Sequence, residues 1–221
     1  MLCDMGRLTI VIPVLDEAAI IAAALQALAP LRGRGAEVIV VDGGSSDGTA
    51  ALAHLFADRV IAGPRNRGAA LNAGAALACR PSDRACRRHW GRFDLRIAGR
   101  HPLLALVARM INWRTRLTGI ASGDQAIFVT HKAIWSVGGF PDLPLMEDIA
   151  LSRKLKRLCR PLWIAAPAVT SGRRWDHHGL WHTIVLMWRL RLAYYLGAEP
   201  ARLALAYGRI TPSRAQSSAG P

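Results

Sequence analysis

The stretch Glu37–Thr49, EVIVVDGGSSDGT, holds a strand, a tight turn and a helix start in succession. Glu37–Val41 is a short run rich in Val and Ile, the pattern of a strand that is buried on both faces of a parallel sheet. The run ends at Asp42, and Asp47 in the following Ser-Ser-Asp-Gly is expected to be a helix cap. A helix is expected over Ala50–Ala57. The segment therefore predicts a strand that leads into a helix, the unit from which α/β folds are built.

The same alternation extends to both sides of this stretch. Leu8–Leu15 (LTIVIPVL) predicts an earlier buried strand, and Glu17–Leu28 carries apolar residues at helical spacing. Downstream, Arg59–Ala62 predicts a third strand and Ala69–Cys79 a helix of small residues. Strands and helices that alternate in this way predict a mainly parallel sheet with crossover helices, which is a Rossmann-like α/β fold.

The pattern changes after Cys79. Arg80–Arg92 contains many arginines and a proline but no apolar periodicity, so we expect a solvated loop. Phe93–Ile97 alternates apolar and polar residues, as an edge or antiparallel strand does. Further elements are expected in the order helix Pro102–Trp113, strand Gln125–Thr130, helix Ile149–Leu158, strand Leu162–Ala165 and helix Trp181–Leu196. We expect one domain over residues 1–207, with halves at 8–79 and 91–207, and a disordered tail at 208–221.

The net charge is +14, from 29 Lys and Arg against 15 Asp and Glu, and it is unevenly distributed. Residues 1–60 carry 4 basic and 7 acidic side chains, whereas residues 61–221 carry 25 and 8. Arginine supplies 26 of the 29 cations, and its planar guanidinium is well suited to phosphate. A codon bias in GC-rich DNA would produce the same excess. No nucleic-acid recognition motif accompanies the charge, so no specific nucleic-acid partner is expected.

The sequence favours a cytoplasmic location. An acid at position 4 argues against a signal peptide, and the four cysteines show no metal-binding or C-x-x-C spacing, as expected for reduced thiols. Gly179–Gly197 is apolar but contains Arg189 and Arg191. A helix packed on the core is favoured there. An amphipathic helix on an anionic membrane surface, at the inner membrane face, is the alternative.

Ligands of open parallel sheets bind at the carboxyl ends of the strands. Here Asp16 and Glu17 follow the first strand, Asp42 ends the second, and Arg65 and Arg67 follow the third. Neither a dinucleotide fingerprint nor a P-loop is present. Acids that can hold a base or ribose, beside arginines that can hold phosphate, predict a mononucleotide pocket.

Three motifs resemble one known family. Val11–Glu17 (VIPVLDE), Val40–Thr49 (VVDGGSSDGT) and Arg67–Gly74 (RGAALNAG) are similar, in order and spacing, to the family 2 glycosyltransferases with the GT-A fold. Gly119–Phe128, Gly138–Leu151 and Ser171–Trp175 are similar to one small bacterial subgroup of that family. The resemblance extends from residue 8 to about residue 207. It implies a nucleotide-binding half and an acceptor half.

The resemblance implies a donor site for a nucleotide-diphosphate sugar. Pro13, Leu15 and Glu17 would lie against the nucleoside. Asp42 would hold the base, with a simple turn residue as the alternative. Arg67 would lie near the base and the phosphates.

The family's acidic pair matches Glu147 and Asp148, at the start of a predicted amphipathic helix. An inverting transferase needs one carboxylate to take the proton of the acceptor hydroxyl as its oxygen attacks the anomeric carbon, and Asp148 is the expected base. Two acids that only favour a helix start are the alternative. Asp124 resembles the family's acceptor-side acid, with a turn residue as the alternative.

A basic motif follows the last predicted strand. Arg173 and Arg174 would stabilise the charge that develops on the leaving diphosphate, and Trp175 would lie on the acceptor side. The alternative is a solvated basic turn with Trp175 packed inward.

Family members carry an Asp-x-Asp motif that holds a divalent metal, Mn²⁺ or Mg²⁺, against the diphosphate. Here the helix at Ala69–Cys79 leads directly into the basic stretch, so an inner strand, a helix and their loops, about 30 residues, are missing. Neither Asp83 nor Asp94 is a convincing replacement. The resemblance thus implies a GT-A glycosyltransferase with one strand-helix unit deleted. It would move a sugar to a hydroxyl acceptor on a glycan, a lipid or a small molecule. A catalytically impaired, nucleotide-binding relic is the alternative.

Overall fold

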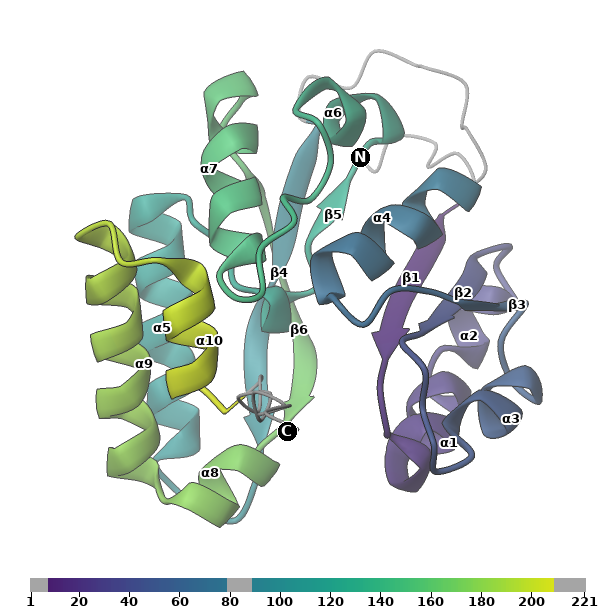
Figure 1. Ribbon diagram of the computed structural model, residues 1–221, viewed down its shortest axis with the longest axis horizontal. Helices are drawn as coiled ribbons and strands as arrows, with labels where there is room; N and C mark the ends of the chain where they lie inside the picture. The colour runs from purple at the N-terminus through teal and green to yellow at the C-terminus, as the bar shows by residue number, and fades with distance from the viewer. Residues whose placement is uncertain (1–7, 79–88, 209–221) are drawn as a thin grey trace, which may run out of the picture.

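The computed structural model describes residues 8–78 and 89–208, whose strands form two three-stranded sheets (Figure 1). Asp83, most of the expected basic loop and the expected tail from residue 209 lie outside the described residues. So do all cysteines except Cys159, which is a free thiol. Among the described residues, no helix is long and apolar enough to cross a membrane.

The strands of the first sheet are parallel, as the sequence predicts. β1 (Thr9–Val14), β2 (Glu37–Asp42) and β3 (Arg59–Ala62) lie side by side, with β2 in the middle. Successive β2 side chains point to opposite faces of the sheet. Val38 and Val40 therefore pack with α1 (Ala18–Gln26) and α3 (Thr49–His54), and Ile39 and Val41 pack with α4 (Arg67–Leu77). A short helix, α2 (Ala29–Arg32), precedes β2.

The second sheet corrects one expectation. β4 (Trp90–Ala98) pairs antiparallel with β5 (Phe128–Val129) at Trp90 and Gly91 and parallel with β6 (Leu162–Ser171), so it is the central strand. Phe93–Ile97, expected as an edge or antiparallel strand, pairs within the described residues with β6 alone, and in parallel. Trp90 and Arg92, expected in a solvated loop, are 0% and 2% exposed. Arg92 can be buried because its Nη1 lies 3.0 Å from the Asp94 carboxylate.

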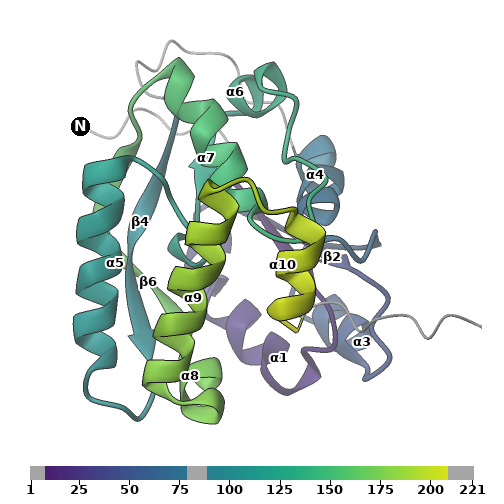
Figure 2. The same ribbon diagram turned by 60° about the vertical axis from the view of Figure 1, so that its left-hand side comes forward.

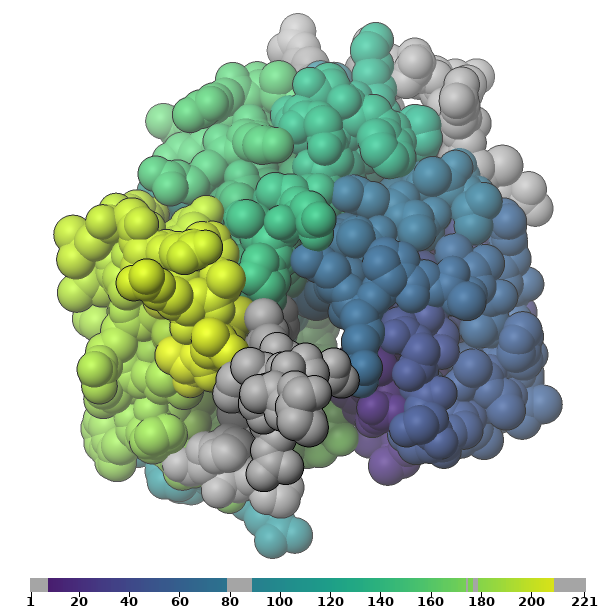
Figure 3. Space-filling view, in the orientation of Figure 1, coloured from purple at the N-terminus to yellow at the C-terminus, as the bar shows by residue number. Residues whose placement is uncertain are grey.

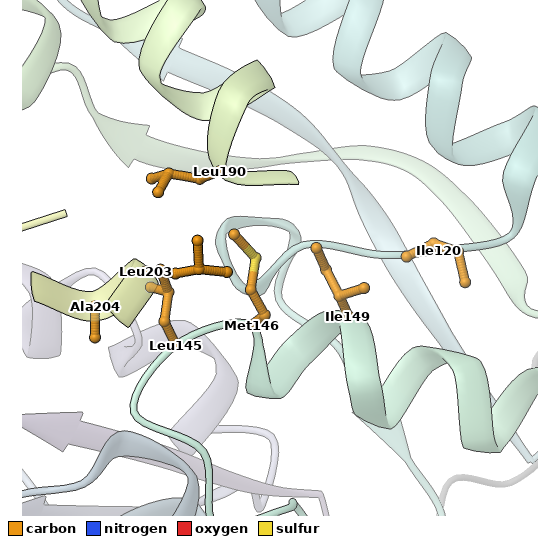
Figure 4. Packing of buried hydrophobic residues seen from close by; sticks show 7 residues of the cluster. All are labelled: Ile120, Leu145, Met146, Ile149, Leu190, Leu203 and Ala204. Atoms are coloured by element: carbon orange, nitrogen blue, oxygen red, sulfur yellow. The ribbon is translucent and has the colours of Figure 1, made fainter. Parts of the chain in front are cut away.

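Helices surround the second sheet (Figure 2). α5 (Leu104–Thr118) and α9 (Leu180–Tyr195) pack on Leu95 and Ile97 of β4. α7 (Glu147–Leu158) and α6 (His131–Ser136) pack near the start of β4, around Trp90. The chain continues through α8 (Arg173–His178) and ends in α10 (Pro200–Ala206), which the sequence analysis did not predict. Figure 4 shows the contact that fixes α10, in which Leu203 meets Leu190 and Met146.

Other boundaries differ by one turn or less, with three exceptions. α5 ends at Thr118 instead of Trp113. The expected strand Gln125–Thr130 is only two residues long, because Gly123–Gln125 forms a 3₁₀ turn with a capping box from Ser122. The last strand runs to Ser171 instead of Ala165 and is paired with β4 over almost its whole length.

Side chains of α4 join the two halves. Asn72 Nδ2 donates to the carbonyl of Phe140 at 2.8 Å, and the Phe140 amide donates back to Asn72 Oδ1 at 2.8 Å. Asn66 Nδ2 lies 2.8 Å from Asp142 Oδ1. Figure 3 shows the two halves in contact where α4 meets the segment between α6 and α7. Within the described residues, no ladder pairs β1 with a strand of the second sheet. The deletion of an inner strand stays a prediction.

Candidate active site

The loops after β1 and β2 are held to each other by hydrogen bonds. The Asp16 amide donates to Ser45 Oγ at 2.9 Å, and the Ser46 amide donates to Asp16 Oδ1 at 2.8 Å. The Glu17 amide donates to Thr49 Oγ1 at 2.8 Å. The carboxyl ends of the two strands therefore present one connected rim, as the parallel sheet requires.

Asp47 is the cap that the sequence predicts. Its carboxylate accepts hydrogen bonds from the Thr49 amide at 3.0 Å and from the Ala18 amide at 2.9 Å. The hydrogen bond from the Thr49 hydroxyl, followed by that from the Ala18 amide, lowers the pKa of Asp47. One carboxylate thus holds the starts of both α1 and α3.

Asp42 ends β2 and is buried. Its carboxylate accepts from the amides of Gly44 and Ser45, at 3.3 and 3.1 Å, and from the Ser45 hydroxyl. These bonds stabilise the turn, which is the alternative role that the sequence leaves open. Binding of a base by Asp42 stays a prediction.

Glu17 is brought to the arginine motif of the other half. Arg173 Nη2 lies 2.8 Å from Glu17 Oε2, and the two side chains are 51% and 35% exposed. Pro13 lies in β1, and Leu15 follows the strand with 36% exposure. Arg174 is the next residue of α8, but its side chain lies outside what the structure describes.

Arg67 is placed by the start of α4. Asn66 caps the helix by accepting from the Gly68 amide at 2.8 Å. Arg67 Nη1 then reaches Glu147 Oε1 at 3.1 Å. A Cβ atom at Gly123 would overlap the Arg67 guanidinium, so the glycine allows the two to touch.

Asp148 is the carboxyl of the site whose pKa is raised. Its Oδ2 accepts from the Gly123 amide at 2.5 Å and its Oδ1 from the Ile149 amide at 2.7 Å. Burial, and then the charge of Glu147, raise the pKa of Asp148. These causes outweigh the two amide hydrogen bonds and the charge of Arg67, which act in the opposite direction. A raised pKa makes a carboxylate a stronger base, as proton transfer from an acceptor hydroxyl requires.

The backbone before this carboxylate is strained. Met146, the residue before α7, has a φ of 68°, in the left-handed region that side chains other than glycine rarely adopt. The Met146 side chain is buried between α9 and α10. Its packing therefore holds the strained residue that aims the start of α7 at Gly123.

The two predicted acceptor-side residues, Asp124 and Trp175, lie in different parts of the structure. Asp124 is exposed and lies in the 3₁₀ turn next to the Gly123–Asp148 contact. Trp175 packs against the cluster of Leu95, Ile97 and Leu104, which is the inward position that the sequence analysis gives as its alternative. A role of Trp175 on the acceptor side stays a prediction.

Two contributors were missed from the sequence. The Gly123 amide is a backbone group and leaves no signal in side-chain chemistry. Arg114, on α5, is half-buried, and its buried Nη2 has no hydrogen-bond partner among the described residues. Burial lowers the pKa of Arg114, and the charge of Asp148 opposes this. Arg114 therefore brings a positive charge, with a free donor, toward the candidate base.

The described residues do not form a metal site. No group of three or more His, Cys, Asp or Glu side chains gathers in residues 8–78 and 89–208. Asp94, one of the two acids considered from the sequence, is paired with Arg92 and Arg116.

Residues 9–79 match the family model "Glycosyl transferase family 2". This segment is therefore similar to glycosyl transferase family 2. It contains β1 to β3 and the whole rim described above. No curated protein matches the chain.

Solved structures support the same fold for the chain as a whole. A mannosyltransferase from Pyrobaculum calidifontis, in complex with GDP-Man and Mn²⁺, has a TM-score of 0.59 at 18% identity over 93% of this chain and 70% of that one. Glucosyl-3-phosphoglycerate synthase from Mycobacterium tuberculosis, in complex with Mn²⁺, UDP and glucosyl-3-phosphoglycerate, gives 0.53 at 17% identity over 75% and 71%. A mycobacterial protein gives 0.54 at 22% identity over 74% of this chain and 66% of its own length. The chain has the GT-A fold of nucleotide-sugar transferases.

Proposed function

We propose that the protein transfers a sugar from a nucleotide-diphosphate donor to a hydroxyl acceptor, with inversion and with Asp148 as the general base. The observation that carries this proposal is the carboxylate of Asp148, which Gly123 orients and whose pKa burial raises. The acceptor oxygen forms a bond to the anomeric carbon, and the bond from that carbon to the diphosphate oxygen breaks. The acceptor proton passes to Asp148, and the nucleoside diphosphate leaves.

The arginines at the rim supply positive charge for the leaving group. Arg67 and Arg173 are each paired with one acid, Glu147 and Glu17, and both guanidiniums remain partly exposed. Donor phosphates would compete for the same guanidiniums and strengthen the interaction as charge develops on the leaving oxygens. Pro13, Leu15 and Glu17 would line the nucleoside.

Asp42 can take part in donor binding without losing its turn. A carboxylate has about four acceptor positions, and three hydrogen-bond donors already occupy part of that capacity. The ring N–H of a base would use the remainder. Solved structures with the same fold hold Mn²⁺ with UDP or GDP-Man.

The impaired relic is a second proposal, and one structural observation favours it. The two sheets are not paired with each other within the described residues. A nucleotide could still bind at the rim of the first sheet while transfer to an acceptor fails.

One experiment separates the two proposals. Purified protein is incubated with UDP-sugars and GDP-sugars, with and without Mn²⁺, and both nucleotide release and the donor-induced shift in Tm are measured. Release that Asp148→Asn abolishes, with the Tm shift retained, supports the transferase. A Tm shift without release from any donor supports the relic. If neither is observed, both proposals fail.

A further inference from the structure

The outer face of α5 is apolar. Leu106, Met110, Trp113 and Leu117 recur every three or four residues, and Leu103 precedes them at the helix start. Their exposed fractions range from 39% at Leu103 to 67% at Trp113. Residues at this spacing share one side of a helix. The opposite side of α5 packs on the second sheet through Leu104, Val107 and Ala108.

α9 repeats the arrangement. Its exposed stripe consists of Trp181, Val185, Trp188, Leu192 and Tyr195, and Leu196 follows directly. The exposed fractions lie between 53% at Val185 and 79% at Leu196. Its buried side includes Leu180 and Thr183. The helix does pack on the core, as the sequence favours, but only along one face.

The two stripes face the same way. α5 and α9 contribute to the same buried cluster on β4, through Leu104 and Leu180 among others. Figures 1 and 2 show the two helices side by side on one face of the second sheet. Each helix therefore turns its apolar stripe away from that sheet. The two stripes together are called the α5–α9 face. It consists of Leu103, Leu106, Met110, Trp113, Leu117, Trp181, Val185, Trp188, Leu192, Tyr195 and Leu196.

Cations accompany this face, and one of them, Arg116, is paired with Asp94 of β4. Neither α5 nor α9 contains Asp or Glu. Arg109 and Arg116 flank the stripe of α5, and Arg189 and Arg191 flank that of α9. At the C-terminal end of the face, a depression is lined by Arg153, Lys156 and Arg157 together with Tyr195, whose ring lies 5.3 Å from the Arg153 guanidinium.

We propose that the α5–α9 face docks on an anionic lipid bilayer. A contiguous apolar surface of this kind marks an interaction site. Tryptophan and tyrosine are enriched at the interface of membranes, and an apolar face flanked by arginines binds anionic lipid in the plane of the surface. A second copy of the chain fits less well, because two copies would bring their arginines together, each on a chain of net charge +14. The proposal does not depend on the proposed transferase activity.

The test uses the full chain and vesicles of two compositions. Co-sedimentation is measured with pure phosphatidylcholine and with equal parts of phosphatidylcholine and phosphatidylglycerol. We expect binding to the anionic vesicles only, with a blue shift of tryptophan fluorescence and a loss of affinity as salt is raised. The triple variant W113S/W181S/W188S is expected to bind roughly tenfold more weakly or worse.

Matched controls keep the test interpretable. Trp135→Ser removes an exposed tryptophan from α6, on another side of the molecule, and is expected to bind as the parent does. Circular dichroism and Tm confirm that the triple variant is folded, which is expected because its three side chains are exposed. Arg109→Glu with Arg189→Glu should weaken binding to anionic vesicles. Equal binding to both vesicle types overturns the proposal. So does a dimer in solution that the tryptophan substitutions dissociate, if vesicle binding is absent.

Discussion

Arg67 Nη1 lies 3.1 Å from Glu147 Oε1, so the first residue of α4 is paired with the first residue of α7. Glu147 is only 3% exposed, whereas Arg67 is 34% exposed. The pair therefore connects α4, which packs on the first sheet, to α7, the helix that carries the candidate base Asp148.

Arg67→Met is expected to lower the free energy of unfolding by about 1–3 kcal/mol, because the buried Glu147 carboxylate loses a paired cation. The partial exposure of Arg67 keeps this loss below that of a fully buried pair. Urea denaturation measures the change. A double-mutant cycle with Glu147→Gln isolates the pair. Additive effects of the two substitutions would show that the pair does not couple the halves.

The pKa of Asp148 should respond in opposite directions to its two charged neighbours. Glu147→Gln removes a negative charge that raises this pKa, so the pKa is expected to fall. Arg67→Met removes a positive charge that lowers it, so the pKa is expected to rise. Carboxyl ¹³C NMR titration measures both shifts directly. In an active enzyme, the low-pH limb of nucleotide release should move with them, and shifts of the same sign would contradict the electrostatic account.

Neutralising Asp148 should separate stability from activity. Because the folded protein holds the proton of Asp148 more tightly than the unfolded chain does, ionisation of Asp148 destabilises the fold as pH rises through the ordinary carboxyl range toward the raised pKa. Asp148→Asn is therefore expected to keep or raise Tm at neutral pH while abolishing nucleotide release.

Asp94→Asn serves as the matched comparison. It leaves the guanidinium of Arg92, 2% exposed, without its carboxylate, and should cost roughly 3–5 kcal/mol. A loss of Tm in Asp148→Asn as large as that in Asp94→Asn would contradict the assignment of Asp148 as a desolvated base.

The first sheet was predictable because its strands are continuous apolar runs between cap and turn residues, as in EVIVV before Asp42. The second sheet was harder. The long β6 alternates little and is mostly exposed, so its extent depends on pairing with β4 and not on a pattern of its own. α9 carries apolar residues on both sides, and periodicity alone does not tell which side is buried.

In the candidate site, too, some features are visible in the sequence and others depend on tertiary contacts. Glu147 and Asp148 are visible as residue types. The Gly123 amide that orients Asp148 depends on a turn held by Gln125, 0% exposed, whose partners Asn112 and Thr115 lie on another helix. Contacts between distant elements of this kind follow from tertiary packing.

The Arg32–Asp58 pair gives a pH-dependent prediction away from the site. Asp58 accepts from Arg32 Nε at 3.0 Å and from the Val38 amide at 2.8 Å. The hydrogen bond from Arg32 holds the pKa of Asp58 below its ordinary value of 3.8. The stabilisation is therefore present above that value and is lost as pH falls through the lowered pKa. Asp58→Asn is expected to cost about 1 kcal/mol at neutral pH.

Thermal unfolding of Asp58→Asn from neutral to strongly acidic pH checks this. The difference from the parent should shrink at the acid end, where Asp58 is protonated in both states of the parent. A difference that does not change with pH would assign the effect to the loss of packing instead.

Gly123→Ala tests the close approach of Arg67 without removing a charge. The added Cβ would overlap the far end of the Arg67 side chain, which can move aside. We expect the fold to be retained, the Arg67–Glu147 pair to weaken, and nucleotide release to decrease because the arginine is displaced from the diphosphate position. The control is Gly33→Ala, where a Cβ meets only ordinary contacts, the nearest being the Ala29 carbonyl at 3.5 Å, and φ is −61°. Gly33→Ala should leave release unchanged. Parent-like release together with an intact Arg67–Glu147 coupling in Gly123→Ala would show that the contact between Gly123 and Arg67 does not position the arginine.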